Sequence, residues 1–185
     1  MRILGISGSL RRGSYNTSLL RAAARSLPPG VELELYDGLA DLPHYNADLD
    51  AESETGPVAS LRQAIADADG VLIATPEFNG SIPGALKNGL DWASRPFPDN
   101  ALRGKPVAVI GASTGLFGAV WAQAEIRKVL GVIGADVIDV ELPVGQAHVA
   151  FAEQGRLADP DLRQVLAELV YALAARARGV ESQAA

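Results

Sequence analysis

A short stretch of hydroxyl, glycine and arginine residues, residues 8–17, lies between the first apolar run of the chain and a helical pattern. Where a strand opens through such a turn onto a helix, unpaired N–H groups and the positive end of the helix dipole face the turn. This arrangement is typical of a phosphate site. We expect hydroxyls, amides, local N–H groups and a guanidinium to hold a terminal monophosphate. The residues expected to do so are Ser9, Arg11, Ser14, Asn16 and Thr17.

The same stretch argues against two common phosphate motifs. Gly8 and Gly13 have the spacing of a Walker A loop, but they are followed by Ser and Tyr where Lys and Ser/Thr are required. The glycines of residues 5–10 also lack the spacing of a dinucleotide fingerprint. A simpler alternative is that Asn16 only caps the helix while the arginines are solvated. The position directly after the first strand favours phosphate binding.

Composition narrows the class of protein and of partner. The 185 residues suit one domain, residues 1–185, with a substantial core. A net charge of −6 argues against nucleic acid as a partner, because a phosphate backbone requires a basic face. The absence of cysteine excludes disulfides, thiol catalysis and thiolate metal sites. The first apolar run is too short for a signal peptide and no stretch reaches the length of a membrane span, so we expect a cytoplasmic protein with no membrane partner.

Short apolar runs alternate with helical patterns along the chain. The expected strands are residues 3–7, 31–36, 70–75, 106–111 and 136–142. The expected helices are residues 16–27, 60–69, 81–92 and 118–130, and a last helix that begins at Asp159-Pro160. This alternation predicts an α/β fold, with a doubly wound five-stranded parallel sheet and helices on both faces. The flavodoxin-like strand order 2-1-3-4-5 suits the count and puts a ligand between the loops after the first and third strands. Residues 37–57 are expected to form a long loop, as a surface excursion or a subunit contact.

Two further turns of small and polar residues follow the third and fourth expected strands, at residues 75–81 and 112–118. Each brings backbone N–H groups close to a ligand at the same edge of the sheet. Donors along the polar edge of a redox ring tune its electron affinity, so the two turns suit a flavin. The alternative is that Glu77 is a solvated turn residue and Phe78 a core aromatic.

These three motifs together resemble the NADPH-dependent FMN reductase family, which includes quinone, azo and chromate reductases. The matching segments are residues 8–16, 76–84 and 111–115. The resemblance implies a flavodoxin-like fold, bound FMN, NADPH or NADH as electron donor, and two-electron ping-pong reduction of quinones or related azo, nitro, chromate or free flavin acceptors. No side chain is then an obligatory acid or base, because the cofactor carries the chemistry.

Carried over position by position, the resemblance implies three groups of FMN contacts. The phosphate loop is Ser9, Arg11, Ser14, Asn16 and Thr17. The loop along the isoalloxazine ring is Pro76, Glu77, Phe78, Asn79 and Gly80, and the third contact is Ser113 with Gly115. Phe78 stands where many members carry Tyr, and residues 113–116 depart from a common Ser-Pro-Gly-Arg pattern. The missing arginine leaves the preference between NADH and NADPH open.

A serine hydrolase is the main alternative enzyme class. Residues 111–115 match G-x-S-x-G between a strand and a helix, and Ser113 is followed in the chain by Asp136 or Asp139 and then by His148. A hydrolase leaves the other two motifs unexplained, so we favour the flavoenzyme. A non-enzymatic flavodoxin, an electron carrier, is the second alternative. Such carriers shield the flavin with aromatic residues, and only 5% of this chain is aromatic.

Two further features bear on metal binding and on oligomeric state. The chain has only two histidines and its Asp and Glu residues show no ligand spacing, so no metal site is expected. In the helix expected at residues 118–130, Trp121 lies on the side opposite the apolar face, together with Glu125 and Lys128. A large aromatic on a polar face is a candidate interface anchor. Family members form dimers or tetramers with the active site near the subunit boundary, so we expect a homodimer or homotetramer.

Overall fold

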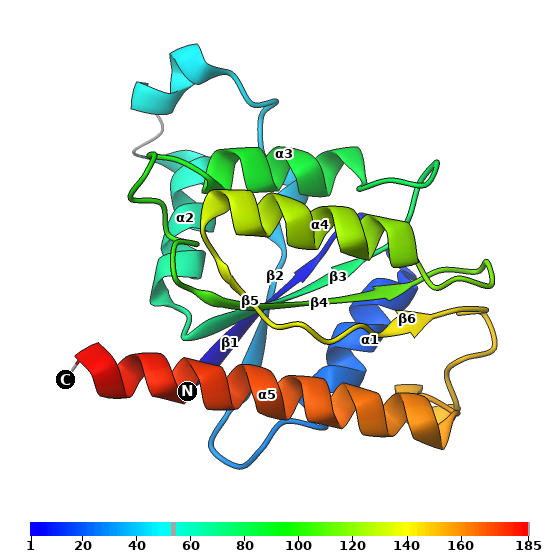
Figure 1. Ribbon diagram of the computed structural model, residues 1–185. Coiled ribbons are helices and arrows are strands. Elements are labelled where there is room, and N and C mark those ends of the chain that lie inside the picture. Colours follow the sequence, from blue (N-terminus) through cyan, green and yellow to red (C-terminus); the bar gives the residue numbers. More distant parts are fainter. Residues whose placement is uncertain (53–54, 185) are drawn as a thin grey trace.

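A parallel sheet and five α-helices alternate in the described part of the chain, residues 1–52 and 55–184 of a computed structural model (Figure 1). The strands are β1 (Arg2–Ser7), β2 (Glu32–Tyr36), β3 (Gly70–Thr75), β4 (Pro106–Ala112), β5 (Asp136–Val137) and β6 (Pro143–Val144). The helices are α1 (Tyr15–Ala24), α2 (Gly56–Asp67), α3 (Gly84–Ala93), α4 (Val120–Ile133) and α5 (Pro160–Ala184). Short 3₁₀ turns cover Gly38–Asp41, Ala47–Glu52 and Glu153–Gly155.

The strand order of the sheet is β2-β1-β3-β4-β5, which confirms the predicted order. Every paired strand runs parallel to its neighbour. All residues of β3 and β4 are buried, because helices cover both faces of these central strands. The carboxyl ends of β1, β3 and β4 therefore meet at one edge of the sheet, where their loops lie side by side.

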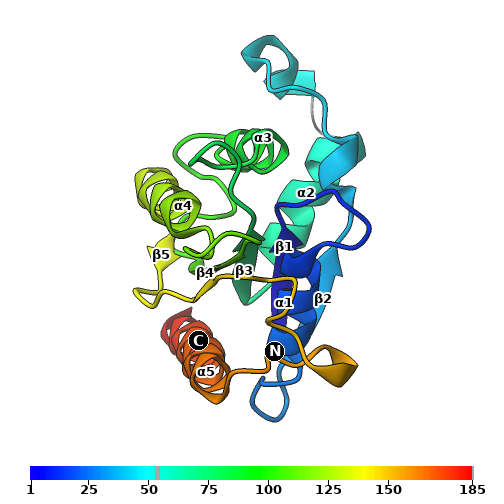
Figure 2. The same ribbon diagram turned by 90° about the vertical axis from the view of Figure 1, so that its right-hand side faces the viewer.

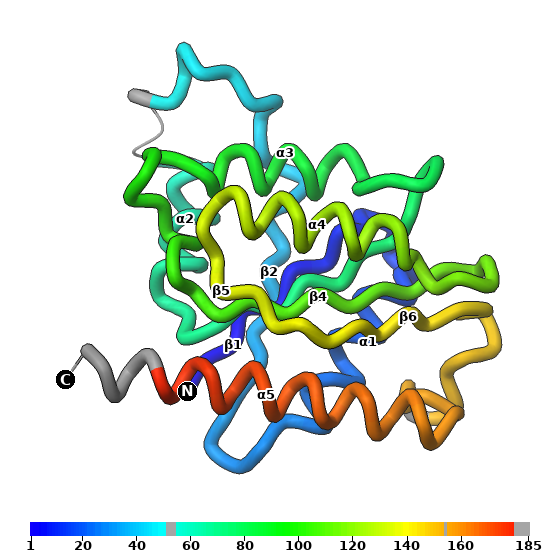
Figure 3. The backbone as a smooth tube through the Cα atoms, in the orientation of Figure 1, coloured from blue at the N-terminus to red at the C-terminus, as the bar shows by residue number. Residues whose placement is uncertain are grey.

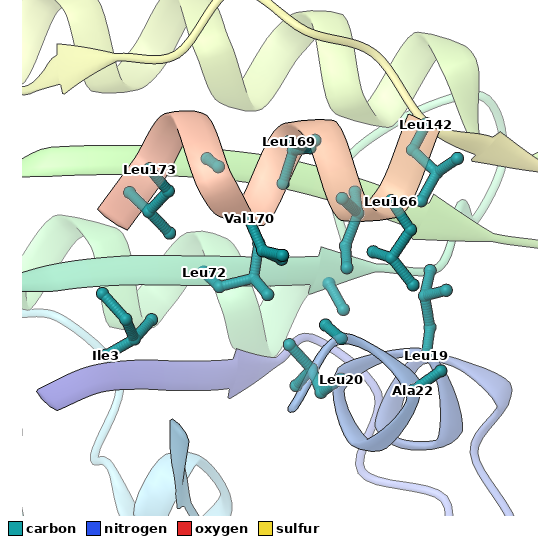
Figure 4. Close-up of a cluster of buried hydrophobic side chains, with 14 of the residues drawn as sticks. Ile3, Leu19, Leu20, Ala22, Leu72, Leu142, Leu166, Leu169, Val170 and Leu173 are labelled. Carbon is teal, nitrogen blue, oxygen red and sulfur yellow. The ribbon is translucent and has the colours of Figure 1, made fainter. Parts of the chain in front are cut away.

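Two apolar clusters hold the layers together. On one face, α1 and α5 pack against the sheet through Leu19, Leu20 and Leu169, with Ile3 and Leu72 from the strands (Figure 4). On the other face, α2, α3 and α4 bury the residues Leu61, Ile65, Leu86, Leu90, Trp92, Ile126 and Leu130. Figure 2 shows the two helical layers on opposite sides of the strands. The helices on both faces confirm the predicted doubly wound class.

The expected fifth strand, residues 136–142, is wrong in its extent. The structure forms two short strands here, β5 and β6, and both pair with β4. Between them Asp139 and Glu141 are exposed, and Glu141 forms an ion pair with Arg127 of α4. This segment is the edge of the sheet and has one neighbour only, so its middle leaves the ladder with the loss of few hydrogen bonds.

Several predicted helix ends are shifted for local backbone reasons. The first helix ends at Ala24 and tightens into a turn, in which Arg25 N donates to Ala22 O and Ser26 N to Ala23 O; Pro28 then disfavours helical backbone at Leu27. The second begins at Gly56 rather than residue 60, with Pro57 in its first turn. Gly118 and Ala119 have positive φ angles of 58° and 61°, so α4 begins only after them.

Residues 44–50, within the segment between β2 and α2, stand away from the sheet (Figure 3). The segment was expected to be a long loop, and in the described residues it contains two 3₁₀ turns; residues 53–54 lie outside the described part. Its base is held by α3, because Pro43 O accepts hydrogen bonds from Asn88 Nδ2 at 2.9 Å and from Trp92 Nε1 at 2.8 Å. Across residues 1–52 and 55–184, no helix is both long and apolar enough to cross a membrane.

Candidate functional site

An open cleft of about 400 Å³ lies at the carboxyl edge of the sheet, between the loops after β1, β3 and β4. Strand order reverses between β1 and β3, and in doubly wound folds ligands bind at such a switch point. The Gly8 N–H donates to Ala74 O at 2.8 Å, which holds the start of the first loop against the end of β3. The cleft is lined by Ser9, Arg11, Ser14, Tyr15, Asn16, Pro76, Glu77, Phe78, Ala112, Ser113 and Thr114.

The first loop is shaped by a helix cap. The buried hydroxyl of Ser14 accepts hydrogen bonds from the N–H groups of Asn16 at 3.2 Å and Thr17 at 3.3 Å, so Ser14, and not Asn16, caps α1. Within the described residues, the N–H groups of residues 10–13 and of Tyr15 have no hydrogen-bond acceptor. This leaves a row of unpaired donors beside the positive end of a helix, which is the composition of an anion site.

Asn16 connects the first loop to the third. Its Nδ2 donates to Ala112 O at 3.0 Å and its Oδ1 accepts from Ala112 N at 2.9 Å. The Asn16 side chain is buried, and both the Nδ2 and the Oδ1 of its amide are hydrogen-bonded to the backbone of one residue, Ala112. Asn16 therefore fixes the start of α1 against the end of β4 through two hydrogen bonds to Ala112, and it also lines the cleft.

Thr17 is a supporting residue of the same loop. Its hydroxyl donates to Ser7 Oγ at 3.0 Å, and Ser7 Oγ in turn lies 3.4 Å from both the backbone N and O of Ser9. Thr17 does not line the cleft. The Thr17 and Ser7 hydroxyls together position the backbone of Ser9, and Ser9 does line the cleft.

Arg11 supplies positive charge to the same end of the cleft. The side chain is exposed, and its guanidinium carbon lies 5.1 Å from the centre of the Tyr15 ring. Among the described residues Arg11 has no ion pair with a carboxylate. Its charge is therefore available to an anion beside the unpaired N–H groups.

The second loop is a tight hairpin. Phe78 and Ser81 exchange two backbone hydrogen bonds of 3.2 Å, and the residues between them, Asn79 and Gly80, have φ angles of 55° and 73°. Positive φ at both central positions defines a type I′ turn, for which Asn-Gly is the preferred sequence. Phe78 is 57% exposed, so it is not a core residue, and it stands at the mouth of the cleft.

Two carboxylates fix this hairpin to α4 from opposite directions. Glu77 Oε2 accepts from the N–H groups of Trp121 at 3.0 Å and Ala122 at 3.1 Å, in the first turn of α4. Glu125 Oε2 on α4 accepts from Ser81 Oγ at 2.6 Å and from Ile82 N at 3.2 Å. We call this pair the hairpin clasp. Glu77 was predicted along a ligand ring or as a solvated turn residue; its carboxylate is a helix cap, while the residue also lines the cleft.

Glu77→Gln is expected to lower the free energy of unfolding by about 1 kcal/mol. The substitution keeps a hydrogen-bond acceptor but removes the charge that interacts favourably with the positive end of α4. Urea unfolding at neutral pH measures the change. Glu168→Gln on α5, whose partner is the neutral Gln164, is the matched control and should change stability little. Equal effects in the two variants would contradict the clasp.

Glu125 is expected to make stability depend on acid pH. Hydrogen bonds from Ser81 and from the Ile82 N–H lower the pKa of the Glu125 carboxyl below its ordinary value of 4.5. A group with a depressed folded-state pKa stabilises above its unfolded-state pKa, and this stabilisation is lost as pH falls through the folded-state pKa. The stability difference between wild type and Glu125→Gln should thus be present at neutral pH, begin to fall near pH 4.5, and disappear once the pH is below the lowered folded-state pKa. Urea unfolding at a series of pH values measures it, and a difference independent of pH would refute the expectation.

The third loop is held by the segment that follows β5. Ser113 N donates to Val144 O at 3.0 Å, and Ala147 N donates to Ser113 O at 3.0 Å. A Cβ on Gly145 would lie 2.2 Å from Leu116 O, so the close approach of the two segments requires glycine there. Gly115 N donates to Ser113 Oγ at 3.2 Å, and Ser113 lines the cleft.

A catalytic triad at Ser113 is not assembled. Asp136 pairs with Pro106 at the start of β4, while Ser113 follows the end of that strand, about 20 Å away at the usual rise per residue. Asp136 also binds Arg176. Asp139 follows Ile138, whose N–H reaches Val107 near the same distant end. The geometry therefore disfavours the hydrolase alternative.

Three exposed aromatic residues and a leucine lie on the hairpin, the third loop and the first turn of α4. We call them the rim patch: Phe78, Leu116, Phe117 and Trp121. The rings of Phe117 and Trp121 meet edge to face with centroids 5.2 Å apart. The Glu77 contact with the Trp121 N–H brings the hairpin beside this pair. An exposed apolar group of this kind beside a cleft is typical of a binding surface.

The structure brings most of the predicted site residues to one cleft and adds others. Thr17, Asn79, Gly80 and Gly115 do not line it; they support Ser9, form the hairpin tip or shape the third loop. The sequence reasoning missed Tyr15, Ala112 and Thr114. Tyr15 directly follows a helix-capping serine, and this position in the first helical turn was a usable signal for it. In the described residues, no group of acidic and histidine side chains could hold a metal ion.

A cleft at the switch point of a doubly wound sheet, with unpaired N–H groups and a guanidinium at one end, is typical of α/β proteins that bind phosphorylated ligands. The chain belongs to the NADPH-dependent FMN reductase family, whose profile matches residues 1–149. This membership confirms the predicted family, the oxidoreductase class, and FMN with NAD(P)H as the cofactors of that class.

Similar proteins agree with the family. An NAD(P)H-dependent FMN reductase of Pseudomonas aeruginosa is 42% identical over 174 residues, 94% of this chain and 93% of the relative. A quinone reductase of Escherichia coli K12 is 39% identical over 140 residues, 75% of this chain and 74% of the relative. The solved structure of FerB, a flavoenzyme NAD(P)H:(acceptor) oxidoreductase from Paracoccus denitrificans, has a TM-score of 0.84 at 36% identity and covers 96% of this chain and 97% of its own.

Proposed function

We propose that this protein is a cytoplasmic NAD(P)H oxidoreductase that keeps FMN bound in the cleft and reduces quinones or related acceptors. The observation that supports this most is the meeting of unpaired N–H groups, Arg11 and the hairpin around one cleft of about 400 Å³, a size within the range of small-molecule sites. When bound, FMN would supply the redox chemistry, which is hydride transfer from a nicotinamide and two-electron reduction of an acceptor.

The residues would divide the task of holding FMN. The Ser9 hydroxyl, the Arg11 guanidinium and the unpaired N–H groups of Arg11 and Tyr15 suit the phosphate, because these residues line the cleft. The hairpin of residues 76–81 and the third loop at Ser113 suit the flat ring, because they present backbone and small side chains to the cleft. The hairpin clasp and the Asn16 amide hold these loops in a fixed relation, and such preorganisation raises affinity for a ligand.

Among the described residues that line the cleft there is no histidine, and the one carboxylate, Glu77, is engaged by two N–H groups of α4. The other titratable groups that line the cleft are Arg11 and Tyr15. The protein's part in the reaction is therefore to bind, to orient and to leave one side of the cleft open. Donor and acceptor would then use the same open side in turn.

Initial-rate kinetics with NADPH and benzoquinone test this proposal. Parallel double-reciprocal lines at several benzoquinone concentrations are expected, because one product leaves before the second substrate enters. Intersecting lines would require NADPH and benzoquinone to be bound at the same time. They would overturn the proposal that donor and acceptor occupy the same side of the cleft in turn. A protein that binds FMN but shows no quinone reduction would favour the electron-carrier alternative.

We further propose that the protein is a homodimer or homotetramer in which the rim patch is covered by another copy. Aromatic residues at the centre of an interface carry much of its binding energy, and Trp121 and Phe117 form a packed pair that is exposed in the single chain. Sedimentation should show wild type as a dimer or larger and Trp121→Glu as a smaller species. Tyr171→Glu, at an exposed aromatic on α5, is the control. A monomeric wild type would refute the proposal.

A further inference from the structure

Three side chains form a layered stack beside the phosphate end of the cleft. The Tyr15 ring lies parallel to the ring of Phe151, with an interplanar angle of 8° and centroids 6.2 Å apart. The Arg11 guanidinium lies over the same Tyr15 ring at 5.1 Å. We call this the Arg11–Tyr15–Phe151 stack. Phe151 comes from the loop between β6 and α5, and that loop is remote in sequence from the cleft-lining residues.

The loop that carries Phe151 is held firmly. Phe151 pairs with Leu157 in an isolated antiparallel bridge, and the hydrogen bonds Ala152 N to Arg156 O (2.8 Å) and Ala158 N to Ala150 O (2.9 Å) extend it. Leu157 is 1% exposed and belongs to the core between α1, α5 and the sheet. Figure 2 shows this orange segment running beside α1.

The same loop is anchored to α5. The Arg163 Nη1 donates to Leu157 O at 2.8 Å and to Ala158 O at 2.7 Å, in the first turn of the helix. The Phe151 ring is therefore presented to Tyr15 by a loop fixed at both of its sides. The backbone of Tyr15 is also held in place, because Tyr15 is the first residue of α1 and directly follows the Ser14 cap.

Arg11 lacks any other restraint on its orientation. It has no ion pair among the described residues, and a free arginine side chain samples many rotamers. A guanidinium held over an aromatic ring by a cation–π contact still has N–H groups that can donate to a phosphate. Restricting the side chain before the ligand arrives reduces the entropy lost on binding.

We propose that Tyr15 and Phe151 are positioning residues that orient Arg11 toward the phosphate of the flavin nucleotide. This makes the loop between β6 and α5 a determinant of selectivity for FMN over riboflavin. The inference rests on the proposed FMN site, but it concerns a part of the chain outside the three loops that line the cleft. Riboflavin has the same ring system and no phosphate, so it isolates the part of the binding that depends on Arg11.

Titration of the apoprotein with FMN and, separately, with riboflavin tests the proposal. Phe151→Leu should weaken FMN binding by about threefold to tenfold and leave riboflavin binding unchanged. Tyr15→Leu should do the same, while Tyr15→Phe, which keeps the ring, should retain wild-type FMN affinity. Tyr171→Leu, an exposed aromatic remote from the stack, is the control and should change neither affinity.

Two other outcomes are distinguishable from these. If Phe151→Leu and Tyr15→Leu leave FMN affinity unchanged, or weaken FMN and riboflavin equally, the stack does not position Arg11 and the inference is overturned. If wild type itself binds FMN no better than riboflavin, the phosphate site of the proposed function fails. Should Phe151→Leu not fold, by its circular dichroism spectrum, Tyr15→Leu decides the matter alone.

Discussion

Replacing Asn16 by leucine is expected to lower the free energy of unfolding by about 2–4 kcal/mol. Leucine has a similar volume but cannot bond to Ala112, so a buried N–H and a buried carbonyl lose their partners together. Each unpaired buried group costs about 1–3 kcal/mol. Because Asn16 joins α1 to the end of β4, FMN binding should weaken as well. Urea unfolding of the apoprotein measures the first effect and FMN titration the second.

Gln123→Leu is the matched control for this substitution. Gln123 is equally buried and carries the same amide, but it makes one bond, from Nε2 to Gly118 O at 2.9 Å. Its Oε1 has no partner in the described part of the chain. Its removal leaves fewer groups unsatisfied, so the loss of stability should be smaller. If Asn16→Leu were no more destabilising than Gln123→Leu, the bond pair to Ala112 would not be the link between the loops that we describe.

Arg11→Met is expected to weaken FMN binding by about tenfold to a hundredfold and to leave riboflavin binding unchanged. Hydrogen bonds to a charged group contribute about 1.5–3 kcal/mol, and methionine keeps much of the apolar stem of arginine while removing its charge. The guanidinium has no carboxylate partner in the described residues, so the fold should not depend on it. Fluorescence titration of the apoprotein with each flavin measures both affinities.

Arg12→Met provides the comparison, since Arg12 is exposed in the same loop but does not line the cleft. Removing either arginine changes the net charge of the protein equally. If Arg11 acts only through general electrostatic attraction, both variants should lose FMN affinity equally. If Arg11 contacts the phosphate, only Arg11→Met should lose it. Equal losses of FMN affinity would argue against a defined role for Arg11.

The sequence predicted the architecture because apolar runs of strand length recur between helical patterns. β3 was predicted with the bounds that it has, since all of its residues are buried and its pattern is continuous. The extent of the fifth strand, predicted over residues 136–142, was wrong because hydropathy does not show that an edge strand leaves its neighbour in the middle. The start of α4 was missed because it depends on two positive φ angles, at Gly118 and Ala119.

For the site, the sequence located the loops better than the contacts of their side chains. Asn16 bonds to a backbone group 96 residues away, and Glu77 caps a helix 44 residues away. The sequence gives no sign of either partner, because both partners are backbone groups and not particular side chains. The stack of Tyr15 on Phe151 was equally invisible, since it depends on how the loop before α5 returns to α1. Local spacing therefore indicates which loops meet, and the tertiary structure decides which residues bind a ligand and which bind one another.

Whether the protein holds FMN that NADPH can reduce is tested directly by a visible absorption spectrum of the purified protein, recorded after FMN is added and the excess removed, and again after NADPH is added under anaerobic conditions. We predict that flavin absorption is retained at one FMN per chain and that NADPH bleaches it. Retained flavin that NADPH leaves oxidised would contradict the reductase and favour an electron carrier. Failure to retain FMN would contradict the bound cofactor on which the proposed function depends.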